Sequence, residues 1–203
     1  MAIYKVRGGD MMDENKPSSI ELESREVWID GEINSTLSKK VIANLLSLAR
    51  LSDDDITLYI NTLGGSIYDG LAIYDVMNAI KPNIITIGVG RVANIVVLLL
   101  ASGTPGKRYA LRSCELILNQ PYMEIAISQE ADFSIKAEHL KASRERFEAI
   151  LSANCKVDSS TIHNRIERES YIYSSEAEEL GLIDHIWSRI RFNTPKREVA
   201  QYK

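Results

Sequence analysis

A pair of adjacent glycines, Gly64 and Gly65, is the feature of this sequence best suited to contact a ligand. The pair lies between a short apolar, β-branched run at 56–60 and a helical pattern that begins at Ile67 and ends before Pro82. Glycine accepts backbone conformations that other residues avoid, so backbone N–H groups here can turn outward and approach a ligand closely. The start of a helix also favours negative charge. We therefore expect this turn to present backbone donors to a ligand.

A second strand–turn–helix unit follows directly. Residues 84–89 are apolar and β-branched, residues 90–94 form a turn that begins with glycine, and residues 95–101 form an apolar helix. Two such units in succession predict a protein of the α/β class with a βαβα layout. In such layouts the functional site lies where the strands end.

The composition is that of an ordinary globular domain. The chain has 203 residues, of which 45% are hydrophobic and 26% are charged. These values suit one domain with a sizeable core. The net charge is −4, and no basic cluster is interleaved with aromatic residues. Both observations argue against nucleic-acid binding.

Three features predict a soluble, cytoplasmic protein. Residues 1–17 are polar and lack the apolar central run of a secretory signal. Residues 84–101 are apolar but include two glycines, Arg91 and Asn94, so a buried strand and helix explain them better than a membrane span. Cys114 and Cys155 lie far apart without metal-like spacing, which predicts buried, reduced thiols. We expect neither metal nor cofactor; an organelle stroma or matrix is the alternative compartment if a transit peptide was removed.

Further elements are expected on both sides of these units. A strand at 26–30 leads into a helix capped by residues 34–36. The apolar face of that helix holds Val41, Leu45, Leu48 and Leu51. The remaining elements are a short strand at 2–6, strands at 108–111, 115–119 and 182–186, a loop at 120–130, and helices at 159–168 and 174–180.

Residues 131–154 predict a long, charged, amphipathic helix without glycine or proline. Its apolar positions recur at roughly helical spacing, and they are Phe133, Ile135, Leu140, Phe147, Ile150 and Leu151. Such a helix is long for a compact small domain. Two arrangements stay open on this pattern: the helix folds back on its own sheet, or it protrudes and packs against another subunit.

A set of ordered motifs resembles the proteolytic subunit of the Clp ATP-dependent protease. The motifs lie at 59–67, 70–77, 80–82, 99–103, 106–111, 119–121, 174–177 and 180–184, and the resemblance covers roughly 25–190 with few gaps. It implies a crotonase-like α/β fold of stacked βαβ units, with a long protruding handle helix at 131–154. Residues 1–24 would then be a mobile N-terminal arm, and residues 191–203 a flexible tail.

The resemblance also implies an activity and partners. Members of this family are serine peptidases that act on unfolded polypeptide with a Ser-His-Asp triad and backbone donors for the oxyanion. Seven subunits form a ring, two rings meet through the handles, and a hexameric AAA+ unfoldase docks on the ring face. Residues 1–24 show no clear match to the family's start, which leaves unfoldase docking open. Trp28 and Tyr59 are candidates for an apolar pocket on the ring face.

This sequence departs from the family at its catalytic positions. Asn94 stands where the family has the nucleophilic serine, Asn119 where it has the histidine, and Glu169 where it has the aspartate. The resemblance therefore implies a degenerate site. The positions of the oxyanion donors are kept, and they are Gly64, Gly65 and Ile95.

An asparagine amide cannot perform the role of the lost serine or of the lost histidine. The Asn94 side chain offers no readily deprotonated nucleophile, and the Asn119 amide cannot accept a proton near neutral pH as imidazole does. Loss of serine or histidine alone lowers turnover on the order of a million-fold. Oxyanion donors and binding alone retain roughly 10³-fold over water. We expect the two asparagines to hydrogen-bond each other in a buried polar pocket.

No other residue is expected to rescue catalysis. Ser66 and Ser102 occupy ordinary polar or small positions of the family motifs, and nothing in the spacing supports a Ser–Lys pair with Lys107. The three histidines lie away from the motif site and are expected at a surface or an interface. They are His139, His163 and His185.

Four hypotheses follow. The one we favour is a non-catalytic ring subunit that shapes a degradation chamber, alone or mixed with an active paralogous subunit. The second is an active peptidase with a rebuilt site, which peptide hydrolysis would reveal. The third is a crotonase-fold acyl-thioester binder, although no adenine-binding signature is evident. The fourth is a plain scaffold without a chamber, which would be a monomer or dimer in solution.

Overall fold

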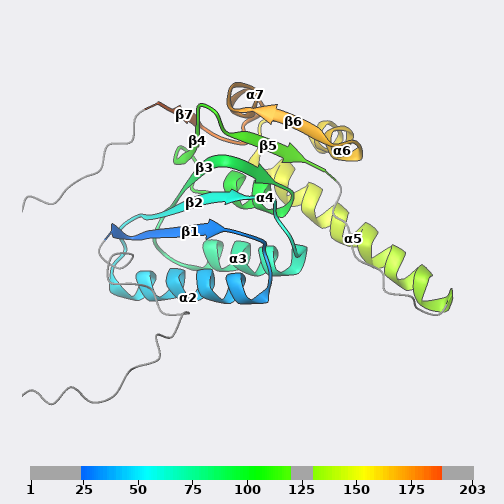
Figure 1. Ribbon diagram of the computed structural model, residues 1–203, viewed down its shortest axis with the longest axis horizontal. Helices are drawn as coiled ribbons and strands as arrows, with labels where there is room; N and C mark the ends of the chain where they lie inside the picture. The colour runs from blue at the N-terminus through cyan, green and yellow to red at the C-terminus, as the bar shows by residue number, and fades with distance from the viewer. Residues whose placement is uncertain (1–23, 120–129, 189–203) are drawn as a thin grey trace, which may run out of the picture.

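The computed structural model describes residues 24–119 and 130–188, which build a mixed α/β fold on one seven-stranded sheet (Figure 1). The strands are β1 (Glu26–Asp30), β2 (Ile56–Thr62), β3 (Ile84–Ala93), β4 (Arg108–Leu111), β5 (Glu115–Leu118), β6 (Ser170–Tyr173) and β7 (His185–Trp187). The helices are α2 (Ser35–Leu51), α3 (Ile67–Ala79), α4 (Ile95–Ala101), α5 (Glu130–Asn154), α6 (Ser159–Glu167) and α7 (Ser174–Leu180). The predicted strand at 2–6 and tail at 191–203 lie outside the described residues, as does the arm apart from Ser24. The predicted loop at 120–130 also lies outside them except for Glu130, which is the first residue of α5.

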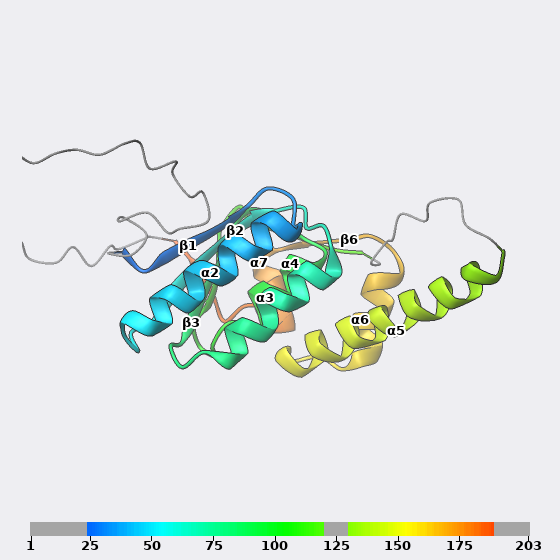
Figure 2. The same cartoon turned by 90° about the horizontal axis from the view of Figure 1, so that it is seen from below.

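The sheet is mostly parallel and is organised around β3. Its strand order is β1-β2-β3-β4-β7, with β5 paired to both β3 and β6. The first half of β3 pairs with β4 and the second half with β5, both in parallel, whereas β5 and β6 are antiparallel. Helices α2, α3 and α4 lie side by side on one face of the sheet (Figure 2). The α/β class and the stacked βαβ units are therefore confirmed.

Local sequence explains how α2 and α4 form. The Asn34 side chain accepts hydrogen bonds from the backbone N–H groups of Thr36 and Leu37, which begins α2 as the capping residues predicted. Every residue of α4 is buried, as expected for an apolar helix enclosed by the sheet and its neighbours. Within the described part of the chain, none of the helices combines the length and apolar character needed to cross a bilayer.

The structure corrects several details. Leu51 is 63% exposed rather than part of the buried face, because it is the last residue of α2 and the chain turns away at Ser52. β3 continues through the predicted turn to Ala93, with an irregular register against β2 where Gly90 adopts φ +64°. β6 had no counterpart among the predicted strands. β7 begins three residues later than expected, since buried Leu182 and Ile183 precede it as a loop.

The long helix α5 has two different halves. Phe147 and Leu151 are buried in the C-terminal half, which packs on α4 and α6. The N-terminal half projects from the body of the molecule (Figures 1 and 2), and Ile135 there is 67% exposed. The C-terminal half thus follows the first arrangement left open by the sequence, and the N-terminal half projects as in the second, whose packing against another subunit stays a prediction. The side chain of Phe133 lies outside what the structure describes.

Candidate functional site

The three substituted positions come together at one end of the sheet. The backbone N–H of Asn94 donates to the carbonyl of Ile117 at 3.0 Å, which fastens the end of β3 to β5. Leu118 pairs with Ser170 in the antiparallel β5–β6 ladder. Asn119 directly follows Leu118, and Glu169 directly precedes Ser170. The two residues therefore lie next to each other just beyond the end of the β5–β6 ladder. The strand register therefore brings distant parts of the sequence to the same edge.

Asn94 occupies a strained elbow between β3 and α4. Its backbone has φ 60° and ψ −133°, a region that L-residues rarely adopt. Such a conformation costs on the order of 1–3 kcal/mol and persists only where the surrounding structure holds it. The residue is 6% exposed, and its side chain makes no capping hydrogen bond to α4.

The two glycines fit tightly against this elbow and against the loop after β1. A Cβ on Gly64, which has φ +93°, would lie 2.8 Å from both the carbonyl oxygen of Ala93 and the Cβ of Asn94. A Cβ on Gly65 would lie 2.3 Å from the carbonyl oxygen of Ile33. Glycine at these positions is therefore required for packing as well as for backbone freedom.

The backbone donors of the glycine turn differ in their availability. The N–H of Gly64 already donates to Oγ1 of Thr62 at 3.2 Å. Ile33 N–H donates to the Gly64 carbonyl and Ser66 N–H to the Ile33 carbonyl, each at 2.8 Å. In a parallel bridge of this kind the N–H of the middle residue, Gly65, points away from its partner. Among the described residues, neither that N–H nor the N–H of Ile95 has a hydrogen-bond acceptor.

The side chains of the two asparagines do not satisfy each other. The Oδ1 atom of Asn119 is buried and has no hydrogen-bond partner in the described part of the chain. The expectation of a hydrogen bond between Asn94 and Asn119 was therefore wrong. The β3–β5 ladder fixes the backbone positions from which both side chains extend. Those positions do not depend on any attraction between the two amides.

Glu169 faces solvent rather than a base. It is exposed, and the hydroxyl of Tyr171 donates a hydrogen bond to its Oε1 atom. This bond, together with the charge of Glu169, raises the pKa of Tyr171. No hydrogen bond joins Glu169 to Asn119 among the residues described in this structure.

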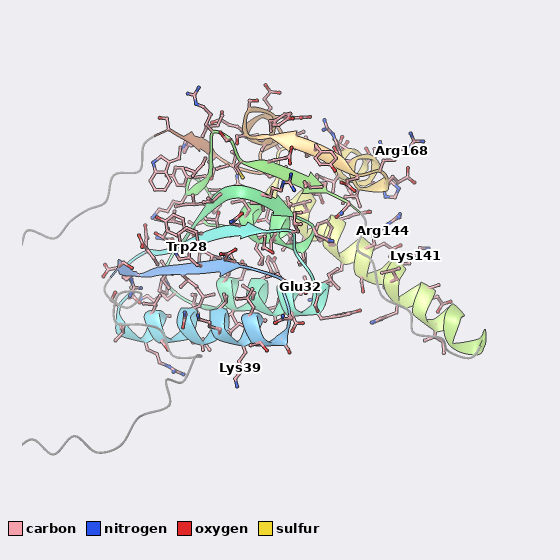
Figure 3. The ribbon with its side chains drawn as sticks, in the orientation of Figure 1. Trp28, Glu32, Lys39, Lys141, Arg144 and Arg168 are labelled. Atoms are coloured by element: carbon pink, nitrogen blue, oxygen red, sulfur yellow. The ribbon has the colours of Figure 1, made fainter. Side chains whose placement is uncertain are left out.

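A cleft of about 590 Å³ opens beside the elbow, where β1, β2 and β3 end. Its lining includes Asp30, Glu32, Asn61, Thr62, Gly64, Gly65 and Arg91. Figure 3 shows Glu32 at this end of β1, on the side from which α5 projects. Gly64 both lines the cleft and contacts Asn94, so the cleft and the elbow are adjacent.

The other candidate serines and the lysine take no part in a catalytic pair among the described residues. Ser66 caps α3 through its hydroxyl, which accepts from the N–H of Asp69. Ser102 ends α4 through its backbone N–H, and its buried hydroxyl has no hydrogen-bond partner among the described residues. Lys107 pairs with Asp55, which precedes β2, whereas the glycine turn follows β2 at the opposite end. None of these pairs creates a nucleophile at the elbow.

The histidines and cysteines are also accounted for away from the elbow. Tyr68 binds His139, Glu148 binds His163, and the ring of Tyr109 lies 5.6 Å from that of His185. Both cysteines are free. Burial raises the pKa of the Cys114 thiol to about 12 and that of Cys155 to about 11, so neither thiol is a ready nucleophile. Among the described residues no cluster of His, Cys, Asp and Glu could hold a metal ion.

Sequence reasoning overlooked Thr62 as a part of this site. Its hydroxyl binds the carbonyl of Gly31 and receives the N–H of Gly64, so it ties the end of β2 to the loop after β1. The available signal was a hydroxyl two residues before a glycine in a turn, since such side chains commonly bond to the backbone two residues on.

The fold and the site together define a class of protein: an α/β scaffold with a strand-to-helix elbow and neighbouring backbone donors at the ends of parallel strands. The chain belongs to the Clp protease family, whose model matches residues 11–189. It is similar to an ATP-dependent Clp protease proteolytic subunit of Ligilactobacillus salivarius (strain UCC118). The two are 38% identical over 166 residues, which cover 81% of this chain and 84% of that protein. The mixed α/β architecture described above is the crotonase-like fold implied by the resemblance.

Proposed function

We propose that this chain is a non-catalytic subunit of a Clp-type assembly that shapes a degradation chamber. The observation that carries the proposal is Asn94, an amide held on the strained elbow at the family's nucleophile position. Asn119 follows β5 at the position of the base and Glu169 precedes β6 at the position of the acid. The scaffold of the site is thus retained while the reacting groups are replaced.

The replacements remove the chemical steps of peptide hydrolysis. Asn94 has no oxygen or sulfur that can be deprotonated to attack a carbonyl, and Asn119 cannot take up the proton that attack releases. Two backbone donors, Gly65 and Ile95, have no acceptor among the described residues. Donors of this kind, together with binding, support roughly 10³-fold acceleration over water when the nucleophile and base are missing.

Self-association is the second part of the proposal. The N-terminal half of α5 projects from the domain and exposes Ile135, which supports pairing of α5 with a partner subunit. The assembly we propose is a seven-membered ring, with two rings stacked through α5, in the cytoplasm. The ring contains this chain alone or with an active paralogous subunit, and it receives unfolded polypeptide from an AAA+ unfoldase. Trp28, 47% exposed and stacked on Tyr59 at 4.6 Å between ring centroids, is a candidate for the docking face.

The test combines three measurements on one preparation of the full chain. Native mass spectrometry gives the assembly, a fluorogenic peptide gives hydrolysis, and a fluorophosphonate probe reports any activated serine. The proposal expects a mass near fourteen subunits, no hydrolysis and no labelling. Hydrolysis that the probe abolishes, with the label on a serine of this chain, would instead establish an active peptidase with a rebuilt site.

A further inference from the structure

A row of mainly aromatic side chains crosses the face of the sheet opposite to α2, α3 and α4 (Figure 2). The strand register places one residue from each of five neighbouring strands in line. The members of this aromatic row are Trp28, Tyr59, Ile87, Tyr109 and His185. Trp28, at one end, is 47% exposed, and its ring stacks on that of Tyr59 with 4.6 Å between the centroids. The row therefore ends in a large aromatic surface that no described residue covers.

Carboxylates flank this exposed end. Glu26 and Asp30 lie two positions before and after Trp28, and the alternating burial of β1 places all three side chains on the same face. The hydroxyl of Tyr59 donates to Glu26 Oε1 at 3.5 Å. Among the described residues, no Lys or Arg faces outward from β1, β2, β4 or β7 on this side of the sheet. Cations are attracted both to carboxylates and to the faces of aromatic rings, so this surface suits a cationic partner.

The C-terminal segment, residues 189–203, has the charge that this surface requires. It begins two residues after Trp187, whose ring lies 5.1 Å from that of Tyr109 on the same face. The segment holds five Lys or Arg residues and one Glu, with apolar residues between them. The N-terminal arm, residues 1–24, holds three Lys or Arg residues and five Asp or Glu. Charge therefore favours the C-terminal segment over the arm as the partner.

The C-terminal segment is also long enough to reach Trp28. The sheet order from β7 through β4, β3 and β2 to β1 takes four steps between neighbouring strands. At about 4.8 Å a step, the distance across the sheet is about 20 Å. Fifteen residues span up to about 50 Å when extended. The segment can therefore follow the whole aromatic row from one edge of the sheet to the other.

We infer that residues 189–203 fold back over the aromatic row of their own chain, with arginine side chains on Trp28 and against the flanking carboxylates Glu26 and Asp30. The regulatory consequence rests on the proposed function, in which Trp28 belongs to the docking face. A partner that docks there must first displace the C-terminal segment, so the segment is a built-in competitor. Attraction between exposed charges is screened by salt, and the contact weakens as ionic strength rises.

The experiment measures acrylamide quenching of Trp28 fluorescence in the full chain. The sequence has two tryptophans, so Trp187→Phe leaves Trp28 as the only indole and serves as the reference chain. The test variant adds R189E/R191E/R197E to the reference, and a conservative variant adds R189K/R191K/R197K. The matched control replaces the three cations of the N-terminal arm by Glu, which makes an equal change of charge in the competing segment.

We expect the Glu test variant to raise the Stern–Volmer constant about twofold, because Trp28 is 47% exposed where nothing covers it. The Lys variant and the arm control should match the reference chain. About 1 M NaCl, where the Debye length is about 3 Å, should bring the reference to the value of the Glu variant.

Three results would overturn the inference. An unchanged constant in the Glu variant would show that the C-terminal segment does not cover Trp28. A rise in the arm control alone would identify the arm as the occupant, and protection that is lost on dilution would assign the contact to a second copy of the chain. The quenching measurement involves neither peptide hydrolysis nor fluorophosphonate, so its failure leaves the proposed function standing. Hydrolysis by the unaltered chain would refute the proposed function and leave the measured contact unchanged.

Discussion

Gly64 and Asn94 are in direct contact: a Cβ added to Gly64 would lie 2.8 Å from the Cβ of Asn94. The same added atom would lie 2.8 Å from the carbonyl oxygen of Ala93, which belongs to the central strand. The glycine turn after β2 and the elbow after β3 therefore form one packed unit. A change on either side has to be accommodated by the other.

This contact predicts an unequal response to two glycine substitutions. Gly64 and Gly31 have nearly the same backbone angle, φ +93° and +94°, but nothing lies within 4 Å of a Cβ on Gly31. Both alanine variants share the backbone strain, whereas only Gly64→Ala adds a steric clash, which costs about 1–3 kcal/mol. Urea unfolding should show that additional loss for Gly64→Ala. Equal losses of unfolding free energy in the two variants would mean that the elbow shifts to accommodate the added Cβ without a measurable cost.

A second prediction concerns the ion pair between Arg108 and Asp184. The Arg108 Nη2 lies 2.6 Å from Asp184 Oδ1 and its Nε lies 2.9 Å from Oδ2, with both residues largely buried. Removing one partner of such a pair leaves a buried charge and costs about 3 kcal/mol. Asp184→Asn should show this loss at pH 7. The exposed pair of Lys81 and Asp53 is the control, and Asp53→Asn should lose no more than about 1 kcal/mol.

The same pair predicts how stability depends on pH. Burial acts to raise the pKa of Asp184, but hydrogen bonds from the Arg108 side chain and from the backbone of Arg108 and Gly106 outweigh it and hold the pKa below its ordinary value. A lowered pKa in the folded state means that the stabilisation is complete above the unfolded-state pKa, about 3.9, and is lost as the pH falls through the folded-state value. Asp184→Asn should therefore flatten the decline of unfolding free energy below about pH 4. If the unfolding free energy of the variant declines as steeply as that of the unaltered chain, carboxylates other than Asp184 cause the decline.

A further prediction distinguishes the two halves of α5. Phe147 is fully buried against the body, and Phe147→Ala should lower the free energy of unfolding by about 3–5 kcal/mol. Ile135 is exposed on the projecting half, so Ile135→Ala should change the same quantity by less than about 0.5 kcal/mol. Native mass spectrometry should show the opposite order, with Ile135→Ser reducing assembly. An Ile135 variant that unfolds like the Phe147 variant would place the projecting half within the fold.

A hydrogen-bond network on α3 and α5 should anchor the projecting helix. The hydroxyl of Ser143 donates to the His139 carbonyl at 2.9 Å and lies 3.0 Å from the hydroxyl of Tyr68, which also contacts His139 Nε2. Because the Ser143 proton is used, Tyr68 donates to Ser143 and accepts from His139. Tyr68→Phe removes both bonds and should speed amide hydrogen exchange in α5 around His139 while leaving β3 unchanged. Unchanged exchange in α5 would show that the network does not restrain the helix.

The repeating βαβ units could be predicted because their strands and helices are strongly periodic and separated by glycine or proline. β6 could not, since only Ile172 of its four residues is buried and its pairing partner, β5, lies more than fifty positions earlier. The identities of the site residues came from motif order. The absence of a bond between Asn94 and Asn119, and the outward turn of Glu169, depend on the register of β3, β5 and β6. Local sequence does not determine that register.

We propose that this chain keeps the scaffold of a serine peptidase site and lacks the reacting groups. The most direct test restores them in the double variant N94S/N119H and measures fluorophosphonate labelling beside the unaltered chain. We predict no labelling of the unaltered chain and labelling of the double variant at position 94, with N94S alone labelled far more weakly. Labelling or hydrolysis by the unaltered chain would contradict the missing chemistry, and an unlabelled double variant would contradict the intact scaffold.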